Sequence, residues 1–203
     1  GSAGIEVVHP GVHLHELVRG EKSMTPTILY LGRLKAYKSV DVLIRAFHTV
    51  VKERPDARLI IAGGGEEEDY LKRFSRDLGL SDERIQFLGK VDEEKKLELL
   101  QKSWMLVNPS FMEGWGIVVI EANACGTPVI ASDIPGLRDS VKNANTGYLV
   151  EYGDSKAFAE SILHIIRDRS LREEMSNEAR AWAENFSWEK SSKEFLMVIN
   201  QAE

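Results

Sequence analysis

The chain has 203 residues, 43% apolar and 29% charged, which is the ordinary composition of a globular protein. Its net charge of −6 argues against a nucleic-acid binder, because such proteins neutralise phosphates with Lys and Arg. The single cysteine, Cys125, excludes an internal disulfide, and no apolar run approaches the roughly 20 residues of a spanning helix. We therefore expect a cytoplasmic protein, with peripheral contact at the inner face of a membrane left open.

Short strand-like runs alternate with helical patterns along the first two thirds of the chain. We expect strands over residues 27–32, 58–62, 84–88, 104–108 and 128–132, and helices over 40–53, 67–78, 93–102 and 117–124. The strand runs are almost continuously apolar, which is typical of a sheet covered on both faces. Because helices separate them, the strands should be parallel with right-handed crossovers. The sequence predicts an α/β fold with a doubly wound, Rossmann-like parallel sheet.

After residue 150 the pattern is almost wholly helical. Asp154 is a candidate N-cap of a helix with a shared apolar face, made of Phe158, Ile162, Ile165 and Ile166. Helices near 171–185 and 188–201 follow, the last with Ser187 as its candidate cap.

We divide the chain into an incoming segment, residues 1–23, a Rossmann-like domain, residues 24–186, and a C-terminal helix, residues 187–203. The incoming segment holds a short expected strand at Ile5–Val8. Its opening Gly1-Ser2 is typical of a remnant left by removal of an affinity tag.

Ligands of a doubly wound sheet bind beyond the carboxyl ends of its strands, so the strand-to-helix loops are the candidate sites. In the first such loop Arg33 leaves the strand after Gly32, and Lys38 precedes the helix. Two cations there could neutralise a diphosphate and stabilise it as a leaving group. On spacing alone, however, two solvated surface cations are the favoured interpretation.

The second loop is Gly63-Gly64-Gly65, followed by four acidic residues over 66–69. It lacks the third glycine of a dinucleotide fingerprint, and its acidic run would occupy the positive helix end that a pyrophosphate needs. We interpret it as a tight turn with an acid-favoured helix start, whose glycines leave room for a nucleotide to approach.

The third loop carries two carboxylates, Glu113 and Glu121, on either side of a Gly-Trp-Gly turn and the start of an apolar helix. Free amides at that helix start can bind a phosphate, and the carboxylates can accept hydrogen bonds from sugar hydroxyls. Stabilisation of the helix start by the same carboxylates explains the spacing equally well.

The whole run from Asn108 to Pro128 resembles the Glu-x7-Glu segment of retaining glycosyltransferases with the GT-B fold, the group called family 4 or group 1. Arg33, followed five residues later by Lys38, also matches that family, although the family usually has Gly where this chain has Ser39. The likeness extends through residues 87–91, 132–141 and 146–150, and it covers about residues 24–186.

The resemblance implies that the chain is the C-terminal, nucleotide-sugar-binding half of such an enzyme, which moves a sugar from a UDP-, GDP- or ADP-sugar to an acceptor hydroxyl. The implied catalytic residues are Arg33, Lys38 and Glu113. The implied contacts to the donor come from Gly32, Gly64, Val91, Gly114, Trp115, Gly116, Ile117 and Glu121, the last on the ribose. No cofactor and no metal are expected, because cations and helix amides would neutralise the diphosphate.

The same resemblance implies that the chain was cut from a longer enzyme. The acceptor, a glycan, lipid or small molecule, would bind the absent N-terminal domain, toward which residues 187–203 would pack. This half alone is expected to be inactive. Two other functions stay open: a non-catalytic nucleotide-binding or interaction module, and a GT-B sugar-nucleotide epimerase.

Several conspicuous residues favour structural roles. His9, His13 and His15 are interpreted as surface histidines, because no carboxylate or cysteine pattern beside them supports a metal. Trp115 is equally compatible with a pocket wall and with a buried plug, and Cys125 is interpreted as a small buried residue.

Overall fold

The computed structural model describes residues 8–201 and contains a six-stranded sheet in the order β3-β2-β1-β4-β5-β6. All five strand pairs are parallel. The strands are β1 (Thr27–Leu31), β2 (Arg58–Ala62), β3 (Ile85–Gly89), β4 (Met105–Asn108), β5 (Val129–Ser132) and β6 (Gly147–Val150). The predicted doubly wound sheet is confirmed, because the strand order reverses between β1 and β4.

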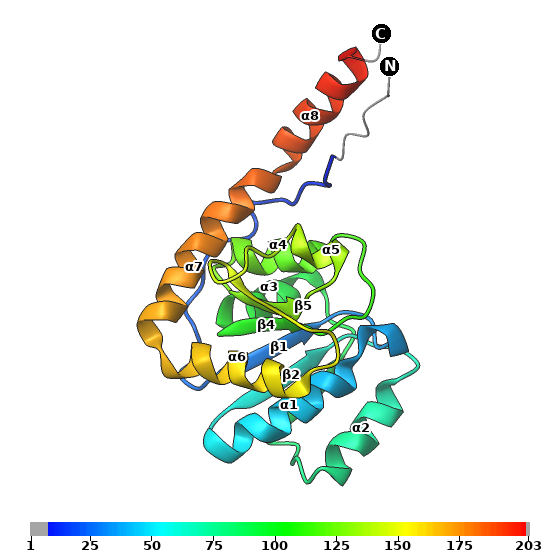
Figure 1. Ribbon diagram of the computed structural model, residues 1–203, viewed down its shortest axis with the longest axis vertical. Helices are drawn as coiled ribbons and strands as arrows, with labels where there is room; N and C mark the ends of the chain where they lie inside the picture. The colour runs from blue at the N-terminus through cyan, green and yellow to red at the C-terminus, as the bar shows by residue number, and fades with distance from the viewer. Residues whose placement is uncertain (1–7, 202–203) are drawn as a thin grey trace.

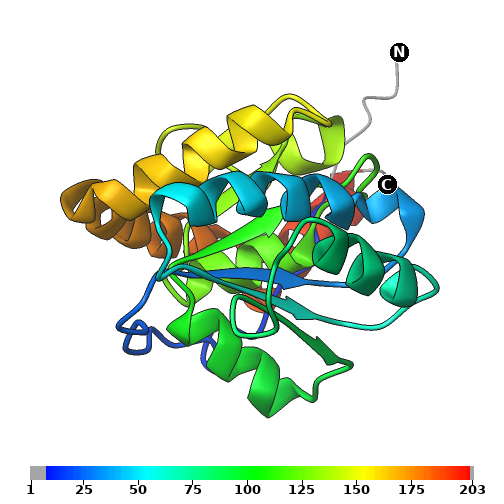
Figure 2. The ribbon, with the colours of Figure 1, turned by 90° about the horizontal axis from the view of Figure 1, so that it is seen from below.

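Helices cover both faces of this sheet (Figures 1 and 2). They are α1 (Val40–Glu53), α2 (Glu68–Asp77), α3 (Glu93–Lys102), α4 (Ile117–Ala124), α5 (Pro135–Arg138), α6 (Ser155–Arg167), α7 (Arg169–Ala183) and α8 (Trp188–Gln201), with 3₁₀ turns η1 (Ala36–Lys38) and η2 (Glu184–Phe186). One core cluster joins α1, α2 and α6 to the sheet, and a second joins α3, α4 and α5 to its other face.

Alternation along the strands explains why two cores form. Ile28 and Tyr30 of β1 belong to the first cluster, whereas Leu29 between them belongs to the second. Successive side chains of a strand point to opposite faces, so a strand that is apolar at every position needs cover on both. The continuous apolar runs in the sequence therefore correspond to strands that are buried on both faces of the sheet.

The predicted helix caps are confirmed. The Asp154 carboxylate accepts hydrogen bonds from the backbone N–H groups of Lys156 and Ala157, each at 3.0 Å, at the start of α6. The Ser187 hydroxyl accepts one from the backbone N–H of Lys190 at 3.2 Å in the first turn of α8. These side chains satisfy amides that have no partner within the helix.

Two elements were not predicted. The edge strand β6 has four residues, and α5 is a single turn that begins at Pro135. The turn α5 is too short to show a period of 3.6 residues. Strand β6 begins with glycine, which is depleted in strands, and its two central residues are only partly buried, unlike those of the equally short β4 and β5. Both elements depend on tertiary contacts. Strand β6 pairs with β5, and Leu137 of α5 packs into the second core cluster.

The incoming segment packs against the region between α7 and α8. The backbone N–H of Val12 donates to the Phe186 carbonyl at 2.8 Å, and Val12 forms a β-bridge with Ser187. Residues 5–7 of the predicted strand at Ile5–Val8 lie outside the described residues, and Val8 belongs to no strand. No helix within residues 8–201 is long and apolar enough to cross a bilayer.

Helix α8 projects away from the sheet layers (Figure 1). Its exposed apolar side chains are Trp188, Phe195, Leu196, Met197 and Ile199. That this helix packs toward a further domain stays a prediction.

Ser39 occupies a position that favours glycine. It lies between η1 and α1 with φ 50° and ψ 40°, in the left-handed region, and its side chain is buried. Its hydroxyl oxygen lies 3.2 Å from that of Tyr152. A left-handed conformation costs an L-residue other than glycine on the order of 1–2 kcal/mol.

Ser39→Gly should relieve this strain, but the entropy of glycine and the lost Tyr152 contact offset most of the gain, so the free energy of unfolding should change by only about 0 to +1 kcal/mol. Chemical denaturation of both proteins measures the difference. Ser161→Gly, in the middle of α6, is the matched control and should lower stability by about 0.5–1 kcal/mol. Equal destabilisation at both positions would contradict the strain at Ser39.

Candidate functional site

A pocket of about 380 Å³ opens at the carboxyl ends of the strands, between the loops after β1, β2 and β3 and the start of α4. Its lining is Leu31, Gly32, Arg33, Ala62, Gly63, Gly64, Lys90, Val91, Lys96, Val118 and Glu121. Five of the residues that the sequence nominated are therefore brought together here, namely Gly32, Arg33, Gly64, Val91 and Glu121. They converge because parallel strands place all their carboxyl ends at one edge of the sheet.

Glu121 is held in the pocket by a lysine that the sequence did not indicate. Lys96 Nζ lies 2.9 Å from Glu121 Oε1 and 2.5 Å from Glu93 Oε2. The Lys96 and Glu121 side chains are only 19% and 17% exposed. Burial alone lowers the pKa of Lys96, but hydrogen bonds to Glu93 and Glu121 outweigh it and raise that pKa. Lys96 gave no signal because its spacing from Glu93 is that of an ordinary pair on a helix surface.

Lys38 and Glu113 form a second ion pair beside this pocket. Lys38 Nζ lies 2.8 Å from Oε1 and 2.6 Å from Oε2 of Glu113, and the two side chains are 11% and 15% exposed. Asn108 donates its amide to Glu113 Oε1 at 3.4 Å and accepts from the Ser110 hydroxyl at 2.6 Å. The sequence assigned Lys38 and Glu113 separate roles, whereas the structure makes them direct partners. Asn108 opens the motif, yet its contact with Glu113 was not predicted.

Arg33 stands in the same region without a carboxylate partner among residues 8–201. Its guanidinium donates to the Tyr37 hydroxyl at 2.7 Å, and the Tyr30 hydroxyl donates to the Arg33 carbonyl at 2.8 Å. Burial raises the pKa of Tyr30, so this phenol stays a proton donor. The backbone of Arg33 is thereby fixed while its exposed side chain keeps its charge available for an anion.

The amino-terminal end of α4 offers a positive helix end. Gly116 precedes it in the left-handed conformation, φ 71°, and no side chain caps the helix or places an acid in its first turn. Unpaired amides and the helix dipole at such an end attract anions. A Cβ atom on Gly114 would meet nothing within 4 Å, so open space lies beside it. Ile117, the first residue of α4, lines an adjoining pocket rather than the 380 Å³ pocket at the strand ends.

Trp115 lies away from this pocket. It is 8% exposed, stacks on His9 with a centroid distance of 4.9 Å, and meets the Phe186 ring edge-on at 5.0 Å. Of the two roles that the sequence left open, the packing favours the buried plug over the pocket wall. Cys125 is buried, and burial raises the pKa of its thiol to about 11, which confirms the small buried residue and excludes a ready thiolate.

Two of the three glycines after β2 serve the fold itself. A Cβ atom on Gly63 would lie 1.8 Å from the Gly32 carbonyl oxygen, and one on Gly65 would lie 2.1 Å from that of Leu34. The loops after β1 and β2 touch through their backbones, which requires glycine. Their acidic neighbours begin α2, as predicted, and Glu66 pairs with Lys35 at 2.6 Å.

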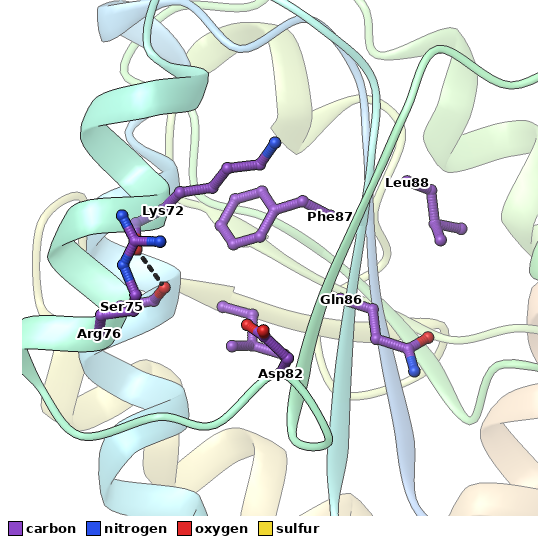
Figure 3. Close-up of a pocket in the computed structure, with 8 residues that line it drawn as sticks. Lys72, Ser75, Arg76, Asp82, Gln86, Phe87 and Leu88 are labelled. Carbon is purple, nitrogen blue, oxygen red and sulfur yellow. Dashed lines mark hydrogen bonds between the residues drawn. The ribbon is translucent and has the colours of Figure 1, made fainter.

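Glu121 and Lys96 also line an adjoining pocket of about 540 Å³, which lies under the incoming segment. A separate pocket of about 430 Å³ lies between α2 and the edge strand β3 (Figure 3). Figure 3 shows Lys72 and Arg76 on the helix side and the Phe87 ring facing them. None of the nominated residues lines this edge pocket, so we place the candidate site at the strand ends.

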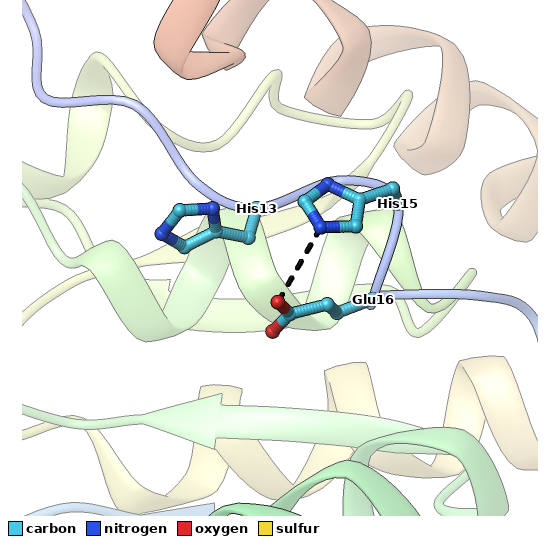
Figure 4. A group of neighbouring side chains, drawn as sticks. All are labelled: His13, His15 and Glu16. Atoms are coloured by element: carbon cyan, nitrogen blue, oxygen red, sulfur yellow. Dashed lines mark ion pairs between the residues drawn. The ribbon is translucent and has the colours of Figure 1, made fainter.

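His13 and His15 are exposed, as predicted, although Glu16 lies beside them, whereas His9 is half-buried and stacks on Trp115, so it is not the surface histidine that was predicted. The ligand atoms of His13, His15 and Glu16 lie within 4.8 Å of one another (Figure 4). The contact of His15 Nε2 with Glu16 Oε1, 3.4 Å, is an ion pair when the imidazole is protonated. All three side chains are exposed, and the expectation that they hold no metal stays a prediction.

Comparison with known proteins agrees with this geometry. The family profile described as glycosyl transferases group 1 matches residues 16–182. A D-inositol 3-phosphate glycosyltransferase of Rhodococcus erythropolis is 32% identical over 215 residues, a match that covers 98% of this chain and 48% of the relative. The chain thus spans about half the length of that relative.

Solved structures share the fold. A sucrose-phosphate synthase from Thermosynechococcus elongatus superposes with a TM-score of 0.88 at 28% identity, over 97% of this chain and 52% of that protein. The Anabaena protein HepE, solved with UDP-glucose, superposes with a TM-score of 0.85 at 22% identity, over 97% of this chain and 57% of that one. Together with the family profile, the α/β sheet and the charged pocket at its strand ends identify the chain as a member of the group 1 glycosyl transferases, with the fold of GT-B enzymes.

Proposed function

We propose that this chain is the donor-binding domain of a retaining glycosyltransferase, which moves a sugar from a nucleoside-diphosphate sugar to an acceptor hydroxyl. The observation that carries this proposal is the gathering of Arg33, Lys38, Glu113 and Glu121 around an uncapped helix start at the carboxyl edge of the sheet. The family membership and the UDP-glucose bound by the similarly folded HepE support a nucleotide sugar as the ligand.

The ribose would bind Glu121. A carboxylate can accept a hydrogen bond on each oxygen, and its charge makes those bonds stronger than neutral ones. Lys96 holds one oxygen of Glu121 at 2.9 Å, which orients the carboxylate before the nucleotide arrives. The base would lie against Gly64 and Val91, which line the same pocket.

The diphosphate would lie between Arg33, Lys38 and the start of α4. Arg33 can bind phosphate oxygens in a fork, and the amides at Gly116–Ile117 present the positive end of the helix. Glu113 would hold Lys38 in place and accept hydrogen bonds from the donor sugar, beside the open space at Gly114. These groups supply the positive charge that a divalent metal supplies elsewhere, so the proposed step uses no cofactor.

In the proposed step, the acceptor oxygen forms a bond to the anomeric carbon on the face from which the diphosphate departs. The bond between that carbon and the phosphate oxygen breaks, and its electron pair leaves with the diphosphate. The acceptor's hydroxyl proton passes to the departing diphosphate. The protein contributes by positioning the reactants and by stabilising charge on the leaving group. The acceptor, a glycan, lipid or small molecule, would be bound by the rest of the enzyme.

Calorimetric titration of the chain with UDP, GDP, ADP and CMP is the first test. One nucleoside diphosphate should bind selectively, and Glu121→Gln should weaken it about tenfold or more, the loss of one charge-assisted hydrogen bond. Glu160→Gln, an exposed substitution on α6 that lies outside the pockets described above, should leave the affinity unchanged. Failure of all four ligands to bind would contradict a preformed donor site.

Arg33→Ala should weaken the nucleoside diphosphate about tenfold or more while hardly changing the affinity for the nucleoside, because only the diphosphate meets the guanidinium. Lys35→Ala is the matched control, since Lys35 belongs to the same loop but pairs with Glu66. The same calorimetric titration measures both variants. Equal losses for nucleoside and diphosphate, or an equal effect of Lys35→Ala, would exclude the proposed role of Arg33.

The pairing of Lys38 with Glu113 can be measured without ligand by a double-mutant cycle of Lys38→Met and Glu113→Gln. Because both side chains are largely shielded, we expect a coupling energy of about 1–3 kcal/mol in chemical denaturation. The solvent-exposed pair Lys95 and Glu98 is the control and should give a clearly smaller coupling, because water screens exposed ion pairs. A coupling no larger than the control would show that Glu113 does not hold Lys38.

A further inference from the structure

A cationic pocket lies on the opposite edge of the sheet from the candidate donor site. It has a volume of about 410 Å³ and lies at the amino-terminal ends of the strands, next to the residues that lead into β1, β4 and β5. Its lining comes from the incoming segment, two strand approaches and α7, and comprises Arg19, Lys22, Ser23, Trp104, Gly126, Arg169, Arg172, Glu173 and Ser176. The proposed transfer of a sugar uses none of these residues.

Positive charge in this pocket exceeds negative charge. Four of the lining side chains are cationic, and Glu173 is the single carboxylate among them. Glu173 is already paired with Arg169, at 2.7 Å. Within residues 8–201, Arg19, Lys22 and Arg172 have no carboxylate at ion-pair distance. Lys22 and Arg172 are partly buried and Arg19 is exposed, so two partly shielded cations with no carboxylate at ion-pair distance lie beside a third at the surface.

Uncharged groups hold these three cations in position. Lys22 Nζ donates to the Thr127 hydroxyl at 2.6 Å, and Arg19 donates to the Asn177 side chain at 3.2 Å. The Arg172 guanidinium lies 3.8 Å from the centroid of the Trp104 ring and donates to the Ile165 carbonyl in the last turn of α6 at 2.8 Å. Such partners fix geometry without neutralising charge, and the site is therefore organised before any anion arrives.

The environment of Lys22 disfavours its protonated form, which a bound anion would stabilise. Burial lowers its pKa to about 7, and among its charged neighbours Arg19 and Arg172 lower it further while only the Cys125 thiol opposes them. Burial also lowers the pKa of Arg172. An anion in the pocket would favour the protonated amine, so anion binding and proton uptake by Lys22 should be linked.

We propose that this pocket binds the phosphate group of a small phosphomonoester, at a site separate from that of the donor diphosphate. Arginine side chains suit phosphate oxygens because their donors form a planar fork, and Lys22 adds a point charge beside them. A monoester is favoured over a phospholipid headgroup, since a monoester carries nearly two negative charges and a diester carries one. An occupied pocket would also strengthen the link between the incoming segment and α7 that Arg19 makes through Asn177.

The test measures binding of inorganic phosphate and of sulfate, a dianion that does not titrate near neutral pH. Amide chemical shifts of Gly126 and Ser176, which line the pocket, report this site, while those of Gly116 report the donor site. The Arg33→Ala background weakens competing binding at the donor site. We expect saturable shifts at Gly126 and Ser176 in that background. Shifts confined to Gly116 would overturn the proposal.

Lys22→Met and Arg19→Gln should each weaken sulfate binding about tenfold or more, as expected for one charge-assisted hydrogen bond. Lys52→Met, an exposed lysine on α1, is the control and should change nothing. Lys22→Met removes an amine whose burial disfavours its charge, so the variant should fold, which its thermal melting confirms or excludes. Arg19→Gln tests the same site independently. Unchanged affinity in both variants would overturn the proposal.

The pH dependence separates Lys22 from a general electrostatic effect. Sulfate should bind more tightly as pH falls from about 8 to about 6, because Lys22 gains a proton across its lowered pKa of about 7. Lys22→Arg should retain binding and lose this dependence, since arginine stays protonated. Vesicles of phosphatidylglycerol form the last arm. If vesicles bind in a Lys22-dependent way but soluble phosphate and sulfate do not, the proposal that the pocket binds a soluble phosphomonoester is wrong.

Discussion

Parallel pairing of the strands is the constraint on which the candidate site depends. It places every carboxyl end at one edge of the sheet, and the strand order reverses where β1 lies beside β4. The loops that follow these two strands must therefore meet, although long stretches of chain separate them. Lys38 and Glu113 are 75 positions apart in sequence and 2.6 Å apart in space for this reason. The parallel sheet depends in turn on the helices, because they cover the apolar side chains on both of its faces.

The charged groups of the site hold one another before a ligand binds. Glu113 is paired with Lys38 and Glu121 with Lys96, in side chains that are 11–19% exposed. A shielded carboxylate without such a partner would be costly, and its orientation would not be fixed. The pairs therefore organise the pocket. Arg33 donates to a tyrosine hydroxyl and, within residues 8–201, has no carboxylate at ion-pair distance, so its charge is available to an anion. A nucleotide would join this network rather than create it.

The sheet also separates two positive regions. Arg33 and the start of α4 lie at the carboxyl edge, whereas Lys22 and Arg172 lie at the amino edge. The incoming segment takes part in the second region through Lys22 and is fixed near the other end of the chain through Val12 and Phe186. A segment without regular structure is thus built into the domain by contacts at both its ends. Its position follows from α7 and η2, which come more than 140 residues later in the sequence.

Sequence alone determined the elements with a clear period and the motif with local spacing. Helix α1 could be predicted from one apolar face, and Glu113, Gly116 and Glu121 from a single loop and helix start, because each signal lies within a few turns of chain. The turn α5 escaped prediction because one turn shows no period, and strand β6 because it begins with glycine and is only half-buried at its centre. Tertiary structure alone decided that Lys96, 25 positions away, holds Glu121 and that Trp115 turns into an aromatic cluster. Contacts of this kind depend on which distant loops the sheet brings together, and the local sequence pattern carries no information about that.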